Sequence, residues 1–244
     1  MAEFAMEIAG HTGLVRSLFD STRDYCGRYL SEKKPEFAVT VRREDLEFEQ
    51  EALRREAEEE GFRFRRFTDP FLDRAAVQRG FAEFLFDRDV LMLHGSVVAV
   101  DGEGYLFAAR SGTGKSTHTR LWCRLLGQRA VMVNDDKPFV MVGEEIRVCG
   151  APWSGKHGLD ANVAVPLKGI CLLERGTENR IRQAEPEEVL PMLMHQGYRP
   201  LEPEKEDRFA ELVQRLGRRV PLWRMQCNKE PEAAATAYEA MREG

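Results

Sequence analysis

The chain has 244 residues, 43% hydrophobic and 32% charged, which is enough for one large core or a core with a smaller lobe. The net charge of −5 argues against nucleic acid or an anionic membrane as the main partner. No apolar run reaches the roughly 18–20 residues of a membrane helix, and the acidic stretch 1–7 lacks the basic region of a signal peptide. We therefore expect a cytoplasmic protein without membrane or nucleic-acid partners, and self-association into a homo-oligomer stays open.

The cysteines are odd in number and have no close pair, which excludes a paired-cysteine zinc motif and disfavours a disulfide framework. We expect reduced thiols, mostly buried. They are Cys26, Cys123, Cys149, Cys171 and Cys227.

Residues 1–88 predict a small α+β lobe. A strand is expected over 37–41, and the charge-dense run 42–60 predicts an exposed helix that Gly61 ends, with a regulatory or partner-docking helix as the alternative. Asp69 and Pro70 predict the start of a second helix, with Asp69 as the cap, whose apolar face packs on a sheet. Because no linker precedes residue 89, we expect this lobe to pack on a core spanning 89–244.

The core begins with an apolar run, 90–100, that predicts one long strand with His94 inside it. Asp101 and Gly102 predict a hairpin turn into a second strand over 105–108. At roughly 3.3 Å per residue, His94 then lies near the far end of that hairpin, where the second strand finishes. We interpret His94 as a residue of the functional site, with a structural core histidine as the alternative.

A glycine-bearing loop follows the strand 105–108, and a helical pattern follows the loop, which is typical of a nucleotide-binding phosphate loop. Its glycines allow consecutive backbone N–H groups to point at one anion, and the helix N-terminus adds its dipole. Lys115 can bind the β- and γ-phosphates and the Ser116 hydroxyl can bind Mg²⁺. Ala109 occupies a position where the general pattern has glycine. The predicted phosphate-binding residues are Ser111, Gly112, Thr113, Gly114, Lys115, Ser116 and Thr117.

Two adjacent carboxylates follow the next predicted strand, 130–133. A helix over 117–126, ended by Gly127, connects the two strands, so they should run parallel with their carboxyl ends at one sheet edge. Asp135 and Asp136 would then lie near Lys115. Two neighbouring carboxylates repel each other unless a cation or proton lies between them, and a magnesium–nucleotide complex supplies the cation.

The rest of the chain predicts a polar loop and further elements. Lys156 in the loop 148–158 is a candidate second cation for phosphoryl charge. A strand is expected over 169–175, with 179–183 pairing with it or extending it. Helices are expected over 185–195, 207–216 and 231–242, and Pro221 places the strand 220–225 at a sheet edge.

Together, Leu93-His94-Gly95, the phosphate loop 111–117 and Asn134-Asp135-Asp136 resemble the HPr kinase/phosphorylase family, over roughly residues 90–175. The amino-acid sequence of the loop is also similar to that of phosphoenolpyruvate carboxykinase. The resemblance implies an α/β fold with a mixed-sheet P-loop core of this type. It also implies that Ser116 binds magnesium together with one of the two aspartates, for which Asp136 is the candidate, and that the other aspartate acts as the base. Which of Asp135 and Asp136 has which role stays open. His94 would support the reacting centre. The chain departs from the family at Thr117-His118, where the protein kinases carry glutamate.

The sequence therefore predicts an ATP- and Mg²⁺-dependent kinase that phosphorylates a hydroxyl of a protein, peptide or small molecule. The catalytic candidates are Asp135, Asp136, His94 and Lys156. The alternative is a regulatory protein or degenerate kinase that binds ATP without transferring phosphate. The acceptor, and the choice of ATP, GTP or pyrophosphate as donor, stay open.

Overall fold

The structure, a computed structural model, describes residues 1–59 and 61–243. The predicted helix end at Glu60 and the terminal Gly244 lie outside the described residues. The chain forms two compact units, Met1–Asp87 and Arg88–Gly244, which are described separately below. Among the described helices, none is both long enough and apolar enough to cross a membrane.

The first unit is a small sheet with helices, as the sequence predicts for an α+β lobe. Its strands pair in the order β1-β2-β3, antiparallel and then parallel. Helix α3 (Asp69–Phe86) packs on β2 and β3, and a Cβ placed on Gly80 would lie 2.6 Å from the Val39 side chain. The predicted packing of this helix on a sheet is confirmed. The strands are β1 Ala2–Ile8, β2 His11–Ser17 and β3 Phe37–Thr40.

Two further helices belong to this unit. Helix α1 (Asp20–Tyr25) contacts β1, β2 and α3. The charge-dense run forms α2 (Arg43–Glu59), most of whose described side chains are exposed, and Gly61 follows it with a φ of +73°. One detail of the prediction is wrong: Thr68 caps α3, and Asp69 is already in its first turn.

The second unit is built on a mixed sheet in the order β4-β8-β9-β10-β6-β5-β7, with β12 beside β10 and β11 beside β12. The predicted mixed-sheet α/β class is confirmed at this level. The strands are β4 Val90–Met92, β5 Ser96–Val100, β6 Glu103–Ala108, β7 Ala130–Asn134, β8 Phe139–Val142, β9 Ile146–Cys149, β10 Ala164–Arg175, β11 Arg180–Gln183 and β12 Leu222–Cys227.

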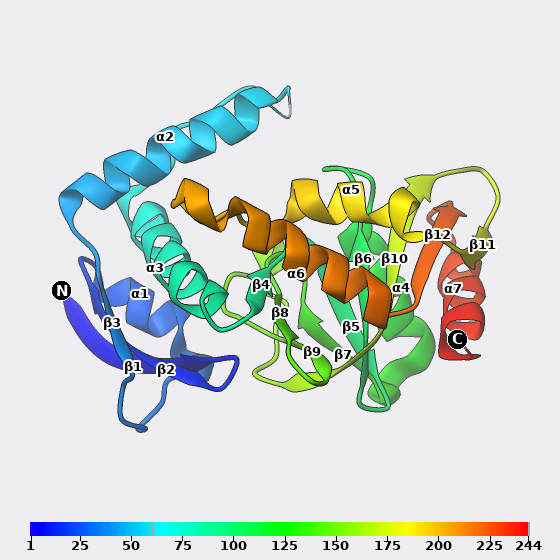
Figure 1. Ribbon diagram of the computed structural model, residues 1–244, viewed down its shortest axis with the longest axis horizontal. Coiled ribbons are helices and arrows are strands. Elements are labelled where there is room, and N and C mark those ends of the chain that lie inside the picture. Colours follow the sequence, from blue (N-terminus) through cyan, green and yellow to red (C-terminus); the bar gives the residue numbers. More distant parts are fainter. Residues whose placement is uncertain (60, 244) are drawn as a thin grey trace. The chain divides into compact units, whose positions relative to one another are not determined.

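Helices cover both faces of this sheet (Figure 1). On one face, α4 packs on β5, β6 and β7 and also against α7. On the other, α5 and α6 pack against each other and against the strands. The apolar core between the sheet, α4 and α7 centres on Trp122, which packs against Tyr105 and Phe107. The helices are α4 Lys115–Leu126, α5 Pro186–Gln196, α6 Glu206–Arg219 and α7 Pro231–Glu243.

The predicted hairpin is confirmed, but the long strand before it is not continuous. Asp101 and Gly102 have φ values of +51° and +87°, which is the geometry of a two-residue type I′ turn. The predicted strand 90–100 is broken at His94 and Gly95 into β4 and β5. The break arises because the backbone N–H of His94 donates to the Gln196 carbonyl and that of Gly95 to the Asp136 carbonyl.

Two predictions about the C-terminal strands are wrong. Strand β12 pairs with both β10 and β11, so it is internal rather than an edge strand. Pro221 permits this because it precedes the strand, where its missing N–H breaks no ladder bond. Strand β11 pairs with β12 instead of with β10. The cysteines are all free thiols in the described chain, three of them buried.

Candidate functional site

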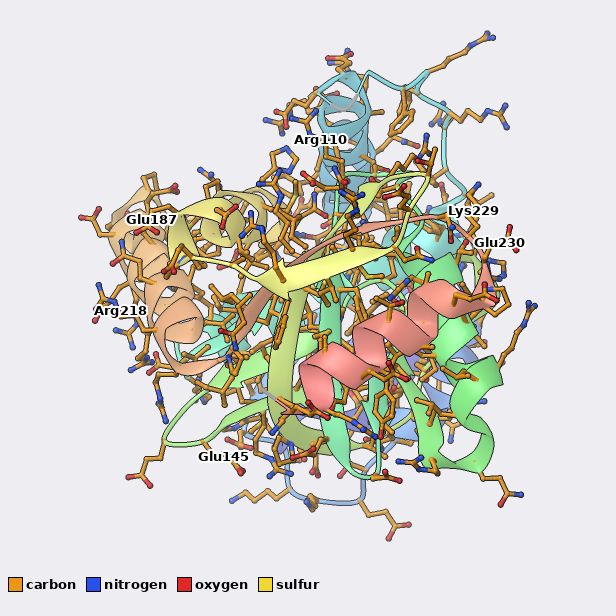
Figure 2. All side chains as sticks on the ribbon, turned by 90° about the vertical axis from the view of Figure 1, so that its right-hand side faces the viewer. Arg110, Glu145, Glu187, Arg218, Lys229 and Glu230 are labelled. Atoms are coloured by element: carbon orange, nitrogen blue, oxygen red, sulfur yellow. The ribbon has the colours of Figure 1, made fainter. Side chains whose placement is uncertain are left out.

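The loop between β6 and α4 has the backbone geometry that a phosphate cradle needs. Gly112 and Gly114 have φ values of +72° and +122°, conformations that side-chain-bearing residues rarely adopt. The described non-glycine residues with positive φ are Ala9, Asp89 and Asp101, so the alanine at position 109 is not strained by its Cβ. Figure 2 labels Arg110, an exposed residue at the start of this loop.

Two cationic side chains donate hydrogen bonds to the backbone of the loop. The side chain of Lys115, only 8% exposed, reaches back so that its Nζ donates to the Ala109 carbonyl at 2.9 Å. Arg175, at the end of β10, donates to the Gly112 carbonyl. The loop is therefore lined by positive charge at its start and at its middle, which favours a bound anion.

The strands that carry the loop and the acidic pair run in the same direction. Strand β5 lies between β6 and β7 and is antiparallel to both. Ser96 pairs with Phe107 on one side, and Val97 pairs with Asn134 on the other. The carboxyl ends of β6 and β7 thus meet at the edge where β5 begins. The structure brings the phosphate loop and the Asp135–Asp136 pair to one sheet edge, with one strand between them.

Asp135 is buried and held in place by hydroxyl groups. It is 5% exposed, and its Oδ1 accepts a hydrogen bond from Ser96 Oγ at 2.7 Å. The same Ser96 hydroxyl contacts Thr119 Oγ1 at 2.8 Å. Thr119 lies on α4, and its hydroxyl also contacts the carbonyls of Lys115 and Ser116 at 3.2 and 3.4 Å. Asp135 is therefore tied to the first turn of the helix that follows the phosphate loop.

Asp136 is more accessible and lies against His94. Its side chain is 33% exposed, and its Oδ1 is 3.3 Å from Nε2 of His94. The turn that carries it is set by Asn134, whose Oδ1 accepts hydrogen bonds from the backbone N–H groups of Asp136 and Lys137 at 2.9 and 2.7 Å. The buried Asn134 side chain in turn donates to the Ala151 carbonyl at 2.7 Å.

Burial lowers the pKa of His94, and the neighbouring side chains of Lys137, Lys115 and His195 lower it further, to about 2. The imidazole is therefore neutral at pH 7. The distance to Asp136 then reports a contact between a neutral ring and a carboxylate, so the ring orients the carboxylate without neutralising it.

The loop that carries Lys156 is positioned by residues on either side of it. Gly155, with a φ of +70°, lies so close to Asp136 that an added Cβ would be 3.2 Å from the Asp136 Cβ. On the other side, His157 Nε2 is 3.2 Å from a guanidinium nitrogen of Arg120 on α4. Lys156 itself is exposed. It lies between the acidic turn and the helix that follows the phosphate loop.

The donor set at this edge fits magnesium in the presence of phosphates. Within the described residues, no group of three or more His, Cys, Asp or Glu side chains could hold a metal by itself. Magnesium usually takes one or two carboxylates plus phosphate oxygens and water, so a triple cluster is not required. The Ser116 hydroxyl and one of the two aspartates suit such a site.

Several positioning residues were missed by reading the sequence. Thr119 falls inside an ordinary helical pattern, and Arg175 is a charged residue at the end of a strand, a position that carries no functional signal by itself. Ser96 and Asn134 lie close in sequence to the candidate residues His94 and Asp135, but their residue types alone do not mark them as part of the site. Ser96 could have been identified from the predicted hairpin, because the hairpin places this hydroxyl opposite the end of the strand that precedes the glycine loop.

The chain matches no protein-family model, and no curated protein matches it in sequence. Among solved structures it is similar to that of the Hpr(Ser) kinase/phosphatase from Coxiella burnetii, over 63% of this chain and 99% of that one. The two are 11% identical, with a TM-score of 0.37. A likeness this distant transfers no role to individual residues, so their functions are inferred below from their own positions.

Proposed function

We propose that this protein is a Mg²⁺- and ATP-dependent kinase that transfers a phosphoryl group to a hydroxyl of a protein, peptide or small molecule. The observation that carries the proposal is the convergence at one sheet edge of a glycine loop with Lys115 and of the Asp135–Asp136 pair with His94. A loop that only bound phosphate would not need two carboxylates beside it, because they repel an anion.

The loop and its cations bind the donor. Backbone N–H groups of 111–117 surround the β- and γ-phosphates, and the positive end of α4 adds to their field. Lys115 exchanges its bond to the Ala109 carbonyl for a phosphate oxygen. Lys156, on the exposed loop beside Asp136, adds positive charge as the γ-phosphoryl group moves. When bound, Mg²⁺ neutralises phosphate charge.

The two aspartates divide the remaining work. We assign the role of base to Asp136, because its partly exposed carboxylate can meet an incoming hydroxyl. The metal ligand, with Ser116, is then buried Asp135 and not Asp136, the candidate that the sequence suggests. The acceptor oxygen forms a bond to the γ-phosphorus while its proton passes to Asp136. The bond from the γ-phosphorus to the bridging oxygen breaks, and its electron pair leaves with ADP. Neutral His94 keeps the Asp136 carboxylate oriented.

The test separates binding from transfer in three variants. Lys115→Met should lose ATP affinity, because a buried cation at the phosphates is removed. Asp136→Asn should bind Mg-ATP like the wild type and lose transfer by about 10²–10⁴-fold, the usual contribution of a general base. Asp135→Asn should lose phosphoryl transfer, and its binding of ATP should no longer depend on Mg²⁺. Full transfer in both asparagine variants would refute the proposal, and tight ATP binding without transfer in the wild type would favour the regulatory alternative.

A further inference from the structure

The segment 62–67, which connects α2 to α3 in the first unit, interleaves phenylalanine with arginine. It begins folded onto the end of α2, where the backbone N–H of Phe62 donates to the Ala57 carbonyl at 2.7 Å. It ends beside the middle of that helix, because the backbone N–H of Phe67 donates to the Gln50 side chain at 3.1 Å. The segment therefore runs back along α2 toward α3 (Figure 1). Its residues are Phe62, Arg63, Phe64, Arg65, Arg66 and Phe67.

The arginines of this segment carry charge that the rest of the described chain does not balance. Arg63, Arg65 and Arg66 are exposed, and no ion pair or hydrogen bond between described residues involves them. The arginines of the flanking helices differ, since Arg54 on α2 and Arg79 on α3 each pair with two carboxylates. Three neighbouring guanidinium groups are therefore available to an anion from outside the chain, and each can bind a carboxylate through two parallel hydrogen bonds.

Aromatic rings lie beside these cations. Phe62 is 55% exposed, more than any other large hydrophobic side chain of the segment or of α3. The ring of Phe67 lies 6.4 Å from that of Phe64 and stacks at 4.6 Å on that of Phe71, which is 38% exposed. The guanidinium of Arg74 lies 6.0 Å from the Phe71 ring. Exposed aromatic rings together with arginines are the composition that distinguishes protein interfaces from the rest of a protein surface.

The charges around the segment select the kind of partner. The unpaired arginines attract an anion, although the chain as a whole has a net charge of −5. Helix α2 presents the exposed side chains of Glu56 and Glu59 only a few residues before the segment. A nucleic acid or an anionic membrane carries negative charge over a wide span and would be repelled by these glutamates, since charges interact over about 8 Å at physiological salt. A short acidic polypeptide can instead place its carboxylates on the arginines and its apolar side chains on the phenylalanines.

We propose that the segment 62–67, together with Phe71, docks an acidic stretch of the protein or peptide that the second unit phosphorylates. The inference rests on the proposed function, and it narrows the acceptor to a polypeptide. A docked acceptor is tethered to the chain that carries the phosphate loop, which raises its effective concentration for the transfer reaction. The segment takes no part in binding ATP or in the chemistry, so its removal should weaken acceptor binding and leave ATP binding intact.

The test is fluorescence anisotropy with two labelled peptides of defined composition. In the first, glutamate alternates with leucine and phenylalanine; in the second, lysine replaces every glutamate. Two triple variants with the same change in net charge are compared: R63Q/R65Q/R66Q in the segment, and R124Q/R180Q/R218Q at exposed arginines of the second unit. A third variant, Phe62→Ser, removes a ring that is mostly exposed and contributes little packing. Calorimetric titration with Mg-ATP checks that each variant is folded.

Wild-type protein should bind the glutamate peptide and not the lysine peptide. The segment variant R63Q/R65Q/R66Q should weaken this binding by about tenfold or more, because three charged contacts are lost, and the control variant should bind like the wild type. Phe62→Ser should also weaken the binding. No binding of the glutamate peptide to the wild type, or equal weakening by the two triple variants, would overturn the proposal.

The same assay distinguishes the other possible partners. Tighter binding of single-stranded DNA or of phosphatidylserine vesicles than of the glutamate peptide would overturn the proposal in favour of that partner. A wild type that elutes as a dimer, with a segment variant that elutes as a monomer, would assign the segment to a second copy of this chain instead.

Transfer of label from γ-labelled ATP keeps this inference separate from the proposed function. Label in the protein and peptide fraction of a cell extract should fall with the segment variant and not with the control. Label in the small-molecule fraction alone would overturn the docking of an acceptor and leave the kinase standing. No label in any fraction would contradict the proposed function, and with it the claim that the docked peptide is an acceptor.

Discussion

The hydrogen bond from Ser96 to Asp135 allows the sharpest test of how the acidic pair is held. Ser96 is fully buried, and its hydroxyl donates to a carboxylate that is itself 5% exposed. Hydrogen bonds to charged groups contribute about 1.5–3 kcal/mol, and removing the donor leaves the buried Asp135 oxygen unsatisfied. Ser96→Ala should therefore lower the free energy of unfolding by about 2 kcal/mol. Urea titration followed by circular dichroism measures this quantity.

A double-mutant cycle isolates the pair from other effects of each substitution. Ser96→Ala combined with Asp135→Ala should show a coupling free energy of about 1–2 kcal/mol, within the range of contacting residues. Ser17→Ala is the matched control, because that buried hydroxyl donates to the neutral Phe19 carbonyl at 3.1 Å and should cost about 1 kcal/mol. A coupling below about 0.5 kcal/mol between positions 96 and 135 would refute the arrangement.

Three further predictions concern backbone strain and pH. Burial lowers the pKa of His118 in the folded protein from 6.5 to about 4, so the unfolded chain binds the proton first as pH falls. The free energy of unfolding should therefore decrease between pH 6.5 and 4, by up to about 3 kcal/mol from this group. In urea titrations, His118→Gln should remove this contribution to the decrease. Gly155→Ala should reduce phosphoryl transfer more than Gly158→Ala, because both positions have a positive φ but only a Cβ at position 155 contacts Asp136. Equal transfer rates in the two variants would contradict the placement of the loop that carries Lys156. Gly114→Ala puts a Cβ at a φ of +122° and should abolish calorimetrically measured ATP binding; retained binding would show that the loop does not need this conformation.

The parts of the site that the sequence predicts are those set by local chemistry. Gly112 and Gly114 before Lys115 mark the loop, and Asp101-Gly102 marks the hairpin that turns β5 back along β6. The direction of β7 follows from the crossover through α4, which is why the acidic pair could be placed near the loop.

The parts that could not be predicted depend on partners far along the chain. The strand break at His94 follows from a hydrogen bond to the Gln196 carbonyl, about 100 residues away. The hydrogen bonds from Thr119 through Ser96 to Asp135 join α4, β5 and the turn after β7. No local sequence pattern around any of the three residues reveals this connection. The internal position of β12 depends on β11 folding back onto it, which periodicity does not encode.

The central claim is phosphoryl transfer, and incubation of the purified protein with Mg²⁺ and γ-labelled ATP tests it most directly, with and without a cell extract fractionated by size. The predicted result is label on an acceptor, lost with Asp136→Asn: a labelled protein or peptide band would identify a protein kinase, and label in the small-molecule fraction a metabolite kinase. Tight ATP binding with no label transferred to any fraction would contradict the claim and leave an ATP-binding regulator.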